Sequence, residues 1–368
     1  MTTRGSAGDL SRGSRIRGCL LGGAMGDALG APVEFQSLAA IREAYGTEGV
    51  TGNEHTFRGN LAITDDTQMT LFTAEGIIRA AHRSTDRGLC APEMVLHNAY
   101  RRWMITQGYG WRQLAAVSPC SHDRSDSWLL REEVLHARRA PGDACTSAML
   151  ARSCEGRTFP IGTTKDPIND SKGCGGVMRV APVGLATEDP FRLGCEVAAI
   201  THGHPTGYLS AGAFAQIVSD LLRGVALTEA IRAALEQRAR HERHEETTAA
   251  IEAALSLAQS GQPPCPELVE TIGRGWIAEE ALAIALYCAL AARDFRHGVL
   301  LAVNHTGDSD STGAICGNLL GVMLGADAIP SAWLADLEAR DIIEQLAHDL
   351  AALEDAGYEP DYQRYPPW

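Results

Sequence analysis

Two carboxylates directly before a long apolar run form the feature that most constrains how this chain can fold. Asp308 and Asp310 stand two residues apart within Gly-Asp-Ser-Asp-Ser-Thr-Gly, residues 307–313, and hydroxyl side chains surround them. Residues 314–324 are apolar and punctuated by glycines, which predicts a buried helix. Oxygen ligands gathered at the start of such a helix suit Mg²⁺ or Ca²⁺. The same residues would also suit a plain N-cap on a solvated loop.

A second acidic cluster stands far away in the sequence. Asp65 and Asp66 lie between Thr64 and Thr67, at the head of an amphipathic run over residues 69–81. If the two helix starts converge, four carboxylates share one small volume. Two unit charges about 4 Å apart repel each other by roughly 4 kcal/mol at an effective dielectric constant near 20. Because several such pairs would not persist uncompensated near neutral pH, we expect divalent cations here.

The first predicted helix covers residues 15–29. Its second half consists largely of Gly and Ala, which allows another backbone to approach closely. Asp27 interrupts this apolar helix and needs a partner, and backbone donors are the common solution for a buried aspartate. Glu34 follows the helix between apolar neighbours, where a carboxylate is either a salt-bridge partner or a poised acid or base.

Two further stretches carry candidate ligand-binding residues. Residues 169–182 contain a glycine-rich turn that we expect to open directly into a helix, and free N–H groups at such a turn bind phosphate. Most glycine-rich turns are nevertheless simply turns. Residues 201–208 place His202 and His204 close enough to contact one ligand. Two histidines without an adjacent carboxylate pair are a poor zinc site, because zinc needs three or four ligands.

Composition limits the classes of partner and the compartment. The 368 residues are 45% hydrophobic, and the formal net charge of −14 argues against a broad nucleic-acid-binding surface. The ten cysteines include no C-x-x-C pair, which favours reduced thiols in a cytoplasmic protein over a zinc ribbon or a disulfide framework. No apolar run reaches the length of about 18 residues that a transmembrane helix needs, so we expect no membrane association.

The pattern of apolar residues predicts an all-α fold. No strand-like alternation persists and no internal repeat occurs. We therefore expect one domain over residues 14–355, with a flexible tail at 1–13 and an irregular tail at 356–368. Helices are expected over residues 15–29, 65–82, 91–106, 126–139, 143–154, 190–201, 206–223, 276–292, 295–303, 314–324 and 335–353, with mostly solvated helical sequence over 227–259.

Five of these stretches together resemble the ADP-ribosylglycohydrolase family, which includes dinitrogenase reductase-activating glycohydrolases and ADP-ribosylarginine hydrolases. The matching motifs occur in the family's order at residues 23–34, 64–67, 173–179, 201–208 and 307–313. The resemblance covers about residues 14–355. It implies an orthogonal all-α bundle with a binuclear Mg²⁺ centre at converging helix N-termini. It also implies removal of ADP-ribose from modified protein side chains.

The resemblance also implies roles for individual residues. Two Mg²⁺ ions per chain, replaceable by Mn²⁺, would be held by Thr64, Asp65, Asp66, Asp308, Asp310 and Ser311. Glu34 matches an acid that assists the reaction, and Asp308 is a second candidate for the base. Pyrophosphate and phosphate contacts would come from Ser171, Gly173, Gly175 and His202. No motif identifies the residue that stacks on adenine.

Three interpretations of the function remain open at this point. The first is an Mg²⁺-dependent hydrolase of protein-linked ADP-ribose, with arginine as the favoured linkage. The second is a hydrolase of a serine linkage, of O-acetyl-ADP-ribose or of a nucleobase linkage. The third is a catalytically silent structural or ADP-ribose-binding relative, which the intact acidic clusters disfavour. We expect a cytoplasmic monomer that acts on an ADP-ribosylated protein and releases ADP-ribose.

Overall fold

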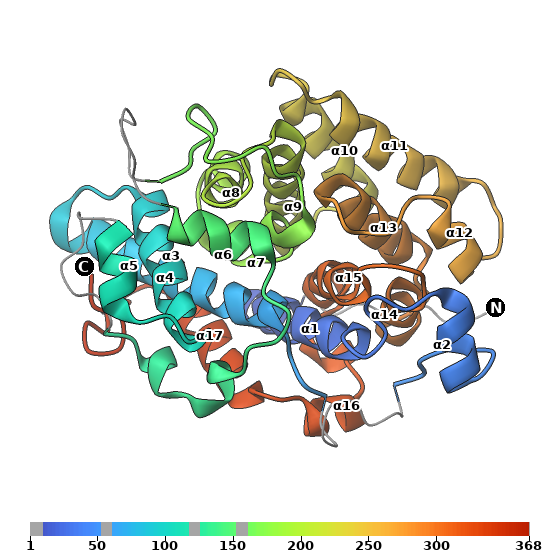
Figure 1. The fold of residues 1–368 in the computed structure, drawn as a ribbon, viewed down its shortest axis with the longest axis horizontal. Helices are drawn as coiled ribbons and strands as arrows, with labels where there is room; N and C mark the ends of the chain where they lie inside the picture. The colour runs from blue at the N-terminus through green and yellow to red at the C-terminus, as the bar shows by residue number, and fades with distance from the viewer. Residues whose placement is uncertain (1–9, 53–60, 118–125, 152–160, 368) are drawn as a thin grey trace.

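The regular secondary structure of the described residues is almost entirely helical. The computed structural model describes residues 10–52, 61–117, 126–151 and 161–367, and these ranges contain two isolated β-bridges and no β-strand (Figure 1). The α-helices are α1 (Arg12–Gly30), α2 (Leu38–Tyr45), α3 (Asp65–Arg87), α4 (Pro92–Thr106), α5 (Trp111–Val117), α6 (Asp143–Leu150), α7 (Ala181–Ala186), α8 (Pro190–Ala199), α9 (Pro205–Leu222), α10 (Leu227–Arg238), α11 (Glu245–Gln259), α12 (Pro266–Glu270), α13 (Ala278–Ala291), α14 (Phe295–Val303), α15 (Ser309–Leu324), α16 (Ser331–Asp336) and α17 (Arg340–Ala352). Short 3₁₀ helices are η2 (Trp128–Arg131), η3 (Glu133–His136), η4 (Cys174–Gly176) and η5 (Ala326–Ala328).

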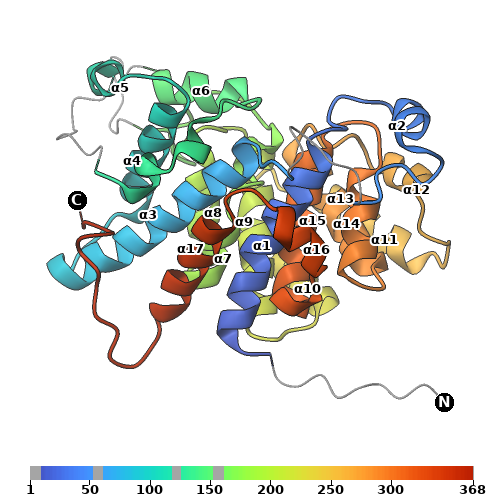
Figure 2. The same ribbon diagram turned by 90° about the horizontal axis from the view of Figure 1, so that it is seen from below.

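Helix α1 runs through the middle of the molecule, and helices from both halves of the chain pack around it. In Figure 2, α3, α4 and α17 lie on one side of α1, whereas α13 and α14 lie on the other. Nearly the whole of α1 after Ile16 is buried. The helices cross at large angles rather than forming a parallel bundle, which confirms the predicted orthogonal all-α fold.

The partner of α1 is the antiparallel helix α15, and their backbones touch. Glycines repeat every four residues along the contact face of each helix, so the two main chains approach without intervening side chains. A Cβ built on Gly22 would lie only 2.3 Å from the carbonyl oxygen of Gly317, and one on Gly18 would lie 2.3 Å from that of Gly321. This confirms that the small residues of the first helix admit another backbone. It also sets the end of α1 beside the start of α15.

Most predicted helices are confirmed, including those at residues 91–106, 190–201 and 295–303. The helix predicted over residues 126–139 is wrong, because this segment forms η2 and η3 separated by an extended residue. Tertiary hydrogen bonds hold it in that shape. Ser127 donates to the buried carboxylate of Glu75 at 2.6 Å, and the carbonyl of Asp126 accepts from Arg79. A local helical pattern does not prevail against such contacts.

Four predicted boundaries also need correction. The helix predicted from residue 314 begins at Ser309, because Asp308 caps it there. The helix predicted from residue 276 begins at Ala278, because Ile277 pairs with Gly173 in a β-bridge. The helix predicted over 335–353 is interrupted, because Leu337 pairs with Leu61 and Ala339 adopts a left-handed φ of 57°. The helix predicted over 143–154 ends at Leu150, and residues 152–154 lie outside the described ranges.

The C-terminal segment has no regular structure but is packed firmly against α3. Tyr365 is only 1% exposed, and its hydroxyl donates to Asp349 at 2.6 Å. The carbonyl of the same tyrosine lies 3.0 Å from Nδ1 of His82 in α3. The cysteines in the described ranges are free thiols. Among the described helices, none combines the length and apolarity needed to cross a membrane.

Candidate functional site

Both acidic clusters begin a helix and also act as its cap. Asp308 is the N-cap of α15, and its carboxylate accepts from the backbone N–H of Ser311 at 3.2 Å. Thr64 is the N-cap of α3, and its hydroxyl accepts from the backbone N–H of Asp66 at 3.3 Å. Capping uses one of the two carboxylate oxygens of Asp308 and one lone pair of the single Thr64 hydroxyl oxygen, so the N-cap interpretation and a ligand role are compatible.

The two helix starts converge as the sequence predicted. The hydroxyl of Thr64 lies 3.5 Å from Oδ2 of Asp66 on its own helix and 3.5 Å from Oδ2 of Asp310 on α15. Carboxylate oxygens of Glu34, Asp308 and Asp310 all lie within 4.8 Å of one another. The ends of α1, α3 and α15 therefore bring their acidic side chains into one place.

Asp27 fastens α3 to α1 at this point. Its fully buried carboxylate accepts from the backbone N–H groups of Thr64 and Thr67, both at 3.1 Å, and from their hydroxyls. Burial raises the pKa of Asp27 to about 6, and the four donors oppose that shift. This confirms the expectation that backbone donors satisfy the buried aspartate. The aspartate also fixes the position of the first acidic cluster.

The buried carboxylates of the site are poorly compensated by the rest of the protein. Burial, and then repulsion by neighbouring carboxylates, raise the pKa of Asp65, Asp66 and Asp310 well above the ordinary value. Oδ1 of Asp66 is buried and has no hydrogen-bond partner among the described residues. An unpaired buried carboxylate oxygen is costly unless a proton or a metal satisfies it. The donor atoms are carboxylate and hydroxyl oxygens, which is the set that Mg²⁺ prefers.

Glu34 lies in the turn after α1, partly exposed at the edge of this cluster. Burial raises the pKa of its carboxyl to about 8, and repulsion by Asp308 and Asp27 adds to the shift. A hydrogen bond with Asp310 acts in the opposite direction. Glu34 therefore faces the acidic cluster, and its partners among the described residues are carboxyl groups rather than a basic side chain.

The glycine-rich turn lies directly beside the acidic cluster. The thiol of Cys174 donates to Oδ2 of Asp308 at 2.8 Å, and the backbone N–H of Cys174 donates to the carbonyl of Trp276 at 3.1 Å. The sequence predicted that this turn opens directly into an α-helix, and that prediction is wrong. The turn forms η4, and α7 begins only at Ala181 because Gly173 is held in the bridge to Ile277.

His202 is buried beneath this turn as a neutral imidazole. Its ring lies close to the turn, since a Cβ built on Gly175 would be 3.0 Å from Cε1. Burial and then the charge of Arg179 lower its pKa to about 3. The Thr201 hydroxyl accepts from Arg179 at 2.6 Å, and it lies 2.8 Å from Nδ1 of His202 and 3.5 Å from the carbonyl oxygen of Ala198. The other ring nitrogen, Nε2, faces the turn, since a Cβ built on Gly173 would lie 3.4 Å from it.

Of the remaining candidate residues, Ser171 lies near the glycine-rich turn and His204 has a structural role. Ser171 lies in the same loop, where its hydroxyl accepts from the N–H of Gly173 at 3.4 Å. His204 caps α9 and contacts Arg243 at 2.9 Å, so it has a structural role separate from that of His202. Cys174 was not predicted as a site residue. Its contact with Asp308 joins two distant loops, and the sequence carries no local signal for it.

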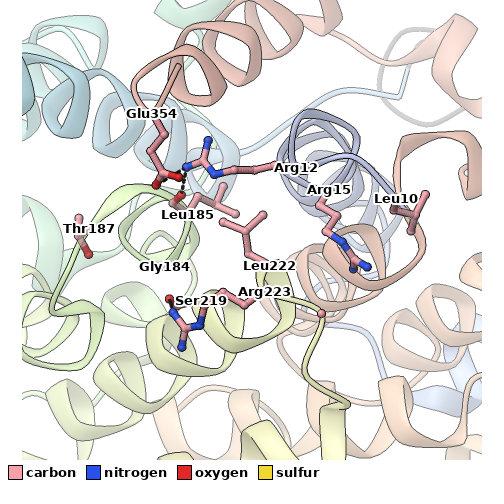
Figure 3. Close-up of a pocket in the computed structure, with 11 residues that line it drawn as sticks. Leu10, Arg12, Arg15, Gly184, Leu185, Thr187, Ser219, Leu222, Arg223 and Glu354 are labelled. Carbon is pink, nitrogen blue, oxygen red and sulfur yellow. Dashed lines mark hydrogen bonds and ion pairs between the residues drawn. The ribbon is translucent and has the colours of Figure 1, made fainter. Parts of the chain in front are cut away.

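A separate polar cavity of ≈ 410 Å³ lies at the opposite end of α1 (Figure 3). Arg12 donates to carbonyls at the C-terminal ends of α17 and α7 and pairs with Glu354 at 2.8 Å. Arg15 donates to carbonyls at the C-terminal ends of α9 and α15. These arginines offset the partial negative charge of four helix C-termini. We therefore assign this cavity a structural role.

Comparisons with known proteins agree with this geometry. The model of the ADP-ribosylglycohydrolase family matches residues 9–360. The chain is similar to the ADP-ribosyl-[dinitrogen reductase] glycohydrolase of Rhodospirillum rubrum, at 27% identity over 89% of this chain and 91% of that protein. It is also similar to the ADP-ribosylhydrolase ARH3 of Mus musculus, at 22% identity over 92% and 91% of the two chains.

A solved structure shares the fold along almost its whole length. It is described as an ADP-ribosylglycohydrolase-related protein complex, and it superposes with a TM-score of 0.63 at 28% identity, covering 94% of this chain and 99% of its own. The family model spans nearly the entire sequence and includes both acidic clusters. The chain therefore belongs to the ADP-ribosylglycohydrolase family.

Proposed function

We propose that this protein is a divalent-cation-dependent hydrolase that removes ADP-ribose from a modified protein side chain, with arginine as the favoured linkage. One observation carries the proposal most directly. Acidic side chains from α1, α3 and α15 are buried together, and Oδ1 of Asp66 lacks a hydrogen-bond partner among the described residues. A fold does not retain such a cluster for stability, because the charges repel each other and are poorly solvated.

The residues that would hold two Mg²⁺ ions, or Mn²⁺ in their place, are Thr64, Asp65, Asp66, Asp308, Asp310 and Ser311. The placement of Glu34 near Asp308 and Asp310 makes it a further candidate ligand. When bound, such ions would supply Lewis-acid assistance and orientation of the sugar hydroxyls. Proton transfer and binding of the rest of ADP-ribose would come from side chains and backbone groups of the protein itself.

The carboxylates supply proton transfer. Hydrolysis breaks the bond between the anomeric carbon of ribose and the leaving atom, through an oxocarbenium-like transition state, while a water oxygen forms the new bond. Glu34 is partly exposed and poised near neutral pH, so it is suited to accept the proton of that water. The proton taken from the water is then delivered to the leaving nitrogen, which departs as a neutral guanidine or its protonated form. Asp308 is the second candidate for the same task.

The glycine-rich turn supplies the binding of the remainder of ADP-ribose. Backbone groups of Gly173 and Gly175 line the turn, and Nε2 of His202 faces it from below, where the tautomer protonated on this nitrogen would donate a hydrogen bond. A neutral imidazole donor contributes a hydrogen bond without a positive charge, which suits a pyrophosphate close to an acidic centre. Ser171 would add a hydroxyl at the edge of this seat.

The linkage is tested by presenting alternative substrates in parallel. Arginine-linked, serine-linked and nucleobase-linked ADP-ribose and O-acetyl-ADP-ribose are incubated with the protein, with and without Mg²⁺, and released ADP-ribose is measured. We expect cation-dependent release from the arginine linkage to be fastest. Faster release from another linkage would replace arginine in the proposal. Binding of ADP-ribose without release from any substrate would identify a silent binding protein.

A further inference from the structure

Two stacked aromatic rings, of which Phe35 is exposed and Trp276 half-buried, lie in segments bordering the acidic site. Phe35 directly follows Glu34 and is 70% exposed, which is unusual for a phenylalanine side chain. Its ring stacks on that of Trp276 with centroids 4.9 Å apart and planes inclined by 25°. One face of Phe35 is thus covered by Trp276, and the large exposed fraction leaves the remainder of the ring open to a ligand.

Neither packing nor turn geometry explains a phenylalanine at this position. The φ angle of Phe35 is 67°, in the left-handed region that disfavours large side chains and that glycine or asparagine adopts more easily. The turn is held by the backbone, since the N–H of Phe35 donates to the carbonyl of Gly307 at 3.2 Å. Strained residues at functional sites often serve the function, so the open ring needs an explanation outside the fold.

The ring pair is fixed to the catalytic carboxylates from both sides. The Phe35 turn is bonded to Gly307, the residue before Asp308. The carbonyl of Trp276 accepts from Cys174, whose thiol donates to Asp308. The loop before Trp276 is itself anchored, because Glu280 accepts the backbone N–H groups at positions 274 and 275. Both segments that carry the rings are therefore anchored beside Asp308 through their backbones.

Charge and shape together indicate what this surface binds. The faces of aromatic rings attract cations, and a planar guanidinium stacks on them better than a tetrahedral ammonium does. Glu34 directly precedes Phe35 in the chain, and its carboxyl group adds to the preference for positive charge beside the ring. The exposed Arg274 is in the same loop, where solvent screens its charge.

We propose that Phe35 and Trp276 form the subsite for the leaving group and that the open face of Phe35 stacks on the planar guanidinium of an ADP-ribosylated arginine. This inference rests on the proposed function and names residues that determine its linkage specificity. A serine-linked substrate has neither a charge nor a plane at the corresponding position. Loss of the ring should therefore penalise the arginine linkage selectively.

The first test compares two linkages in variants of Phe35. Phe35→Asn removes the ring but keeps a residue that tolerates a left-handed φ, so the turn is preserved. We expect the ratio of kcat/KM for arginine-linked over serine-linked ADP-ribose to fall about tenfold, mainly through KM, as loss of a desolvated cation–π contact implies. Phe35→Tyr keeps an aromatic ring and should have the same ratio as wild type. Leu89→Asn, which removes another exposed apolar side chain, is the matched control and should leave the ratio unchanged.

A second test measures binding without turnover. The full-length, Mg²⁺-loaded protein is titrated calorimetrically with methylguanidinium and with methylammonium, with and without ADP-ribose. We expect wild type to bind methylguanidinium at least about fivefold more tightly and Phe35→Asn to lose this preference. The titration reports on the subsite even if wild type hydrolyses no ADP-ribosyl linkage, so the two proposals can fail separately. Equal binding of the two cations by wild type would overturn the inference. An equal loss of rate on both linkages in Phe35→Asn would also overturn it.

Discussion

Gly26 of α1 and Gly313 of α15 are in backbone contact, and a Cβ built on Gly26 would lie 1.9 Å from the carbonyl oxygen of Gly313. Gly313 lies only three residues after Asp310, and Gly26 directly precedes Asp27. The contact therefore fixes the distance between the acidic start of α15 and the aspartate that positions α3. The candidate site can therefore assemble only when the glycine faces of α1 and α15 are packed together.

Gly26→Ala should destabilise the protein and disturb the site together. The added methyl group has backbone rather than a flexible side chain against it, so the helices must separate, and we expect a loss of about 3 kcal/mol in the free energy of unfolding. Gly13→Ala is the control on the same helix, because nothing lies within 4 Å of its added Cβ. Urea unfolding of both variants measures the two free energies of unfolding. Equal stability of the two variants would contradict the close contact.

Asp66→Asn should change stability in opposite directions depending on the cation. Without metal, the substitution removes one of several repelling buried carboxylates, so the melting temperature should rise above that of wild type. With Mg²⁺, wild type should gain far more stability than the variant, because the variant lacks a ligand. The test measures the melting temperatures of wild type and Asp66→Asn, each in chelator and in Mg²⁺. An unchanged response to Mg²⁺ in Asp66→Asn would remove this residue from the ligand set.

Loss of a ligand should also slow the reaction. Asp65→Ala, Asp66→Ala, Asp308→Ala and Asp310→Ala should each lower kcat/KM by at least about 100-fold, which corresponds to roughly 2.7 kcal/mol of transition-state stabilisation. Steady-state hydrolysis of arginine-linked ADP-ribose measures the effect. Circular dichroism of each variant shows whether its helices remain intact. Near-normal activity of Asp310→Ala would mean that the metal assignment at that residue is wrong.

The metal-free protein should become less stable as the pH rises above neutrality. The pKa of Glu34 is raised from 4.5 to about 8 in the folded chain, so between these values the folded state binds more protons than the unfolded state. The free energy of unfolding then falls with rising pH. His97 and His202, whose pKa values are lowered to about 3, act in the opposite sense only below about pH 6.5. Urea unfolding in chelator from about pH 6.5 to 8.5 should show a steeper fall for wild type than for Glu34→Gln. Identical slopes would contradict the environment assigned to Glu34.

Glu34→Gln separates a role in proton transfer from a role in binding. Glutamine keeps the shape of the side chain and loses both the charge and the proton acceptor. If Glu34 acts mainly in the transition state, the variant should bind ADP-ribose nearly as wild type does and hydrolyse substrate far more slowly. Calorimetric affinity and single-turnover rates, measured on both proteins, test this. Equal rates would make Glu34 structural, and a parallel loss of affinity and rate would make it a ligand.

The sequence predicts those parts of the fold and site that depend on local chemistry. The start of α3 is predicted correctly because Thr64 is a capping residue directly before an amphipathic run, whereas α15 begins at Ser309 and not at the predicted residue 314. The carboxylates and hydroxyls of both clusters would suit one cation site if the two helix starts converge, and the resemblance to the family implies that they do. The buried Asp27 signalled that the first helix required polar partners.

The remainder depends on contacts between distant segments. The glycine faces of α1 and α15 are visible in the sequence, but nothing local states that they meet in antiparallel register. The shape of residues 126–139 is imposed by the buried carboxylate of Glu75. The contact of Cys174 with Asp308 likewise exists only after folding. Tertiary contacts therefore decide these details over local propensity.

The most direct test of the account is the dependence of hydrolysis on a divalent cation. The protein is treated with EDTA, exchanged into metal-free buffer, and supplied with arginine-linked ADP-ribose before and after addition of Mg²⁺ or Mn²⁺. The account predicts that release of ADP-ribose stops after chelation and returns when either cation is added. Full turnover in metal-free buffer would contradict the assignment of the converging carboxylates as a metal centre.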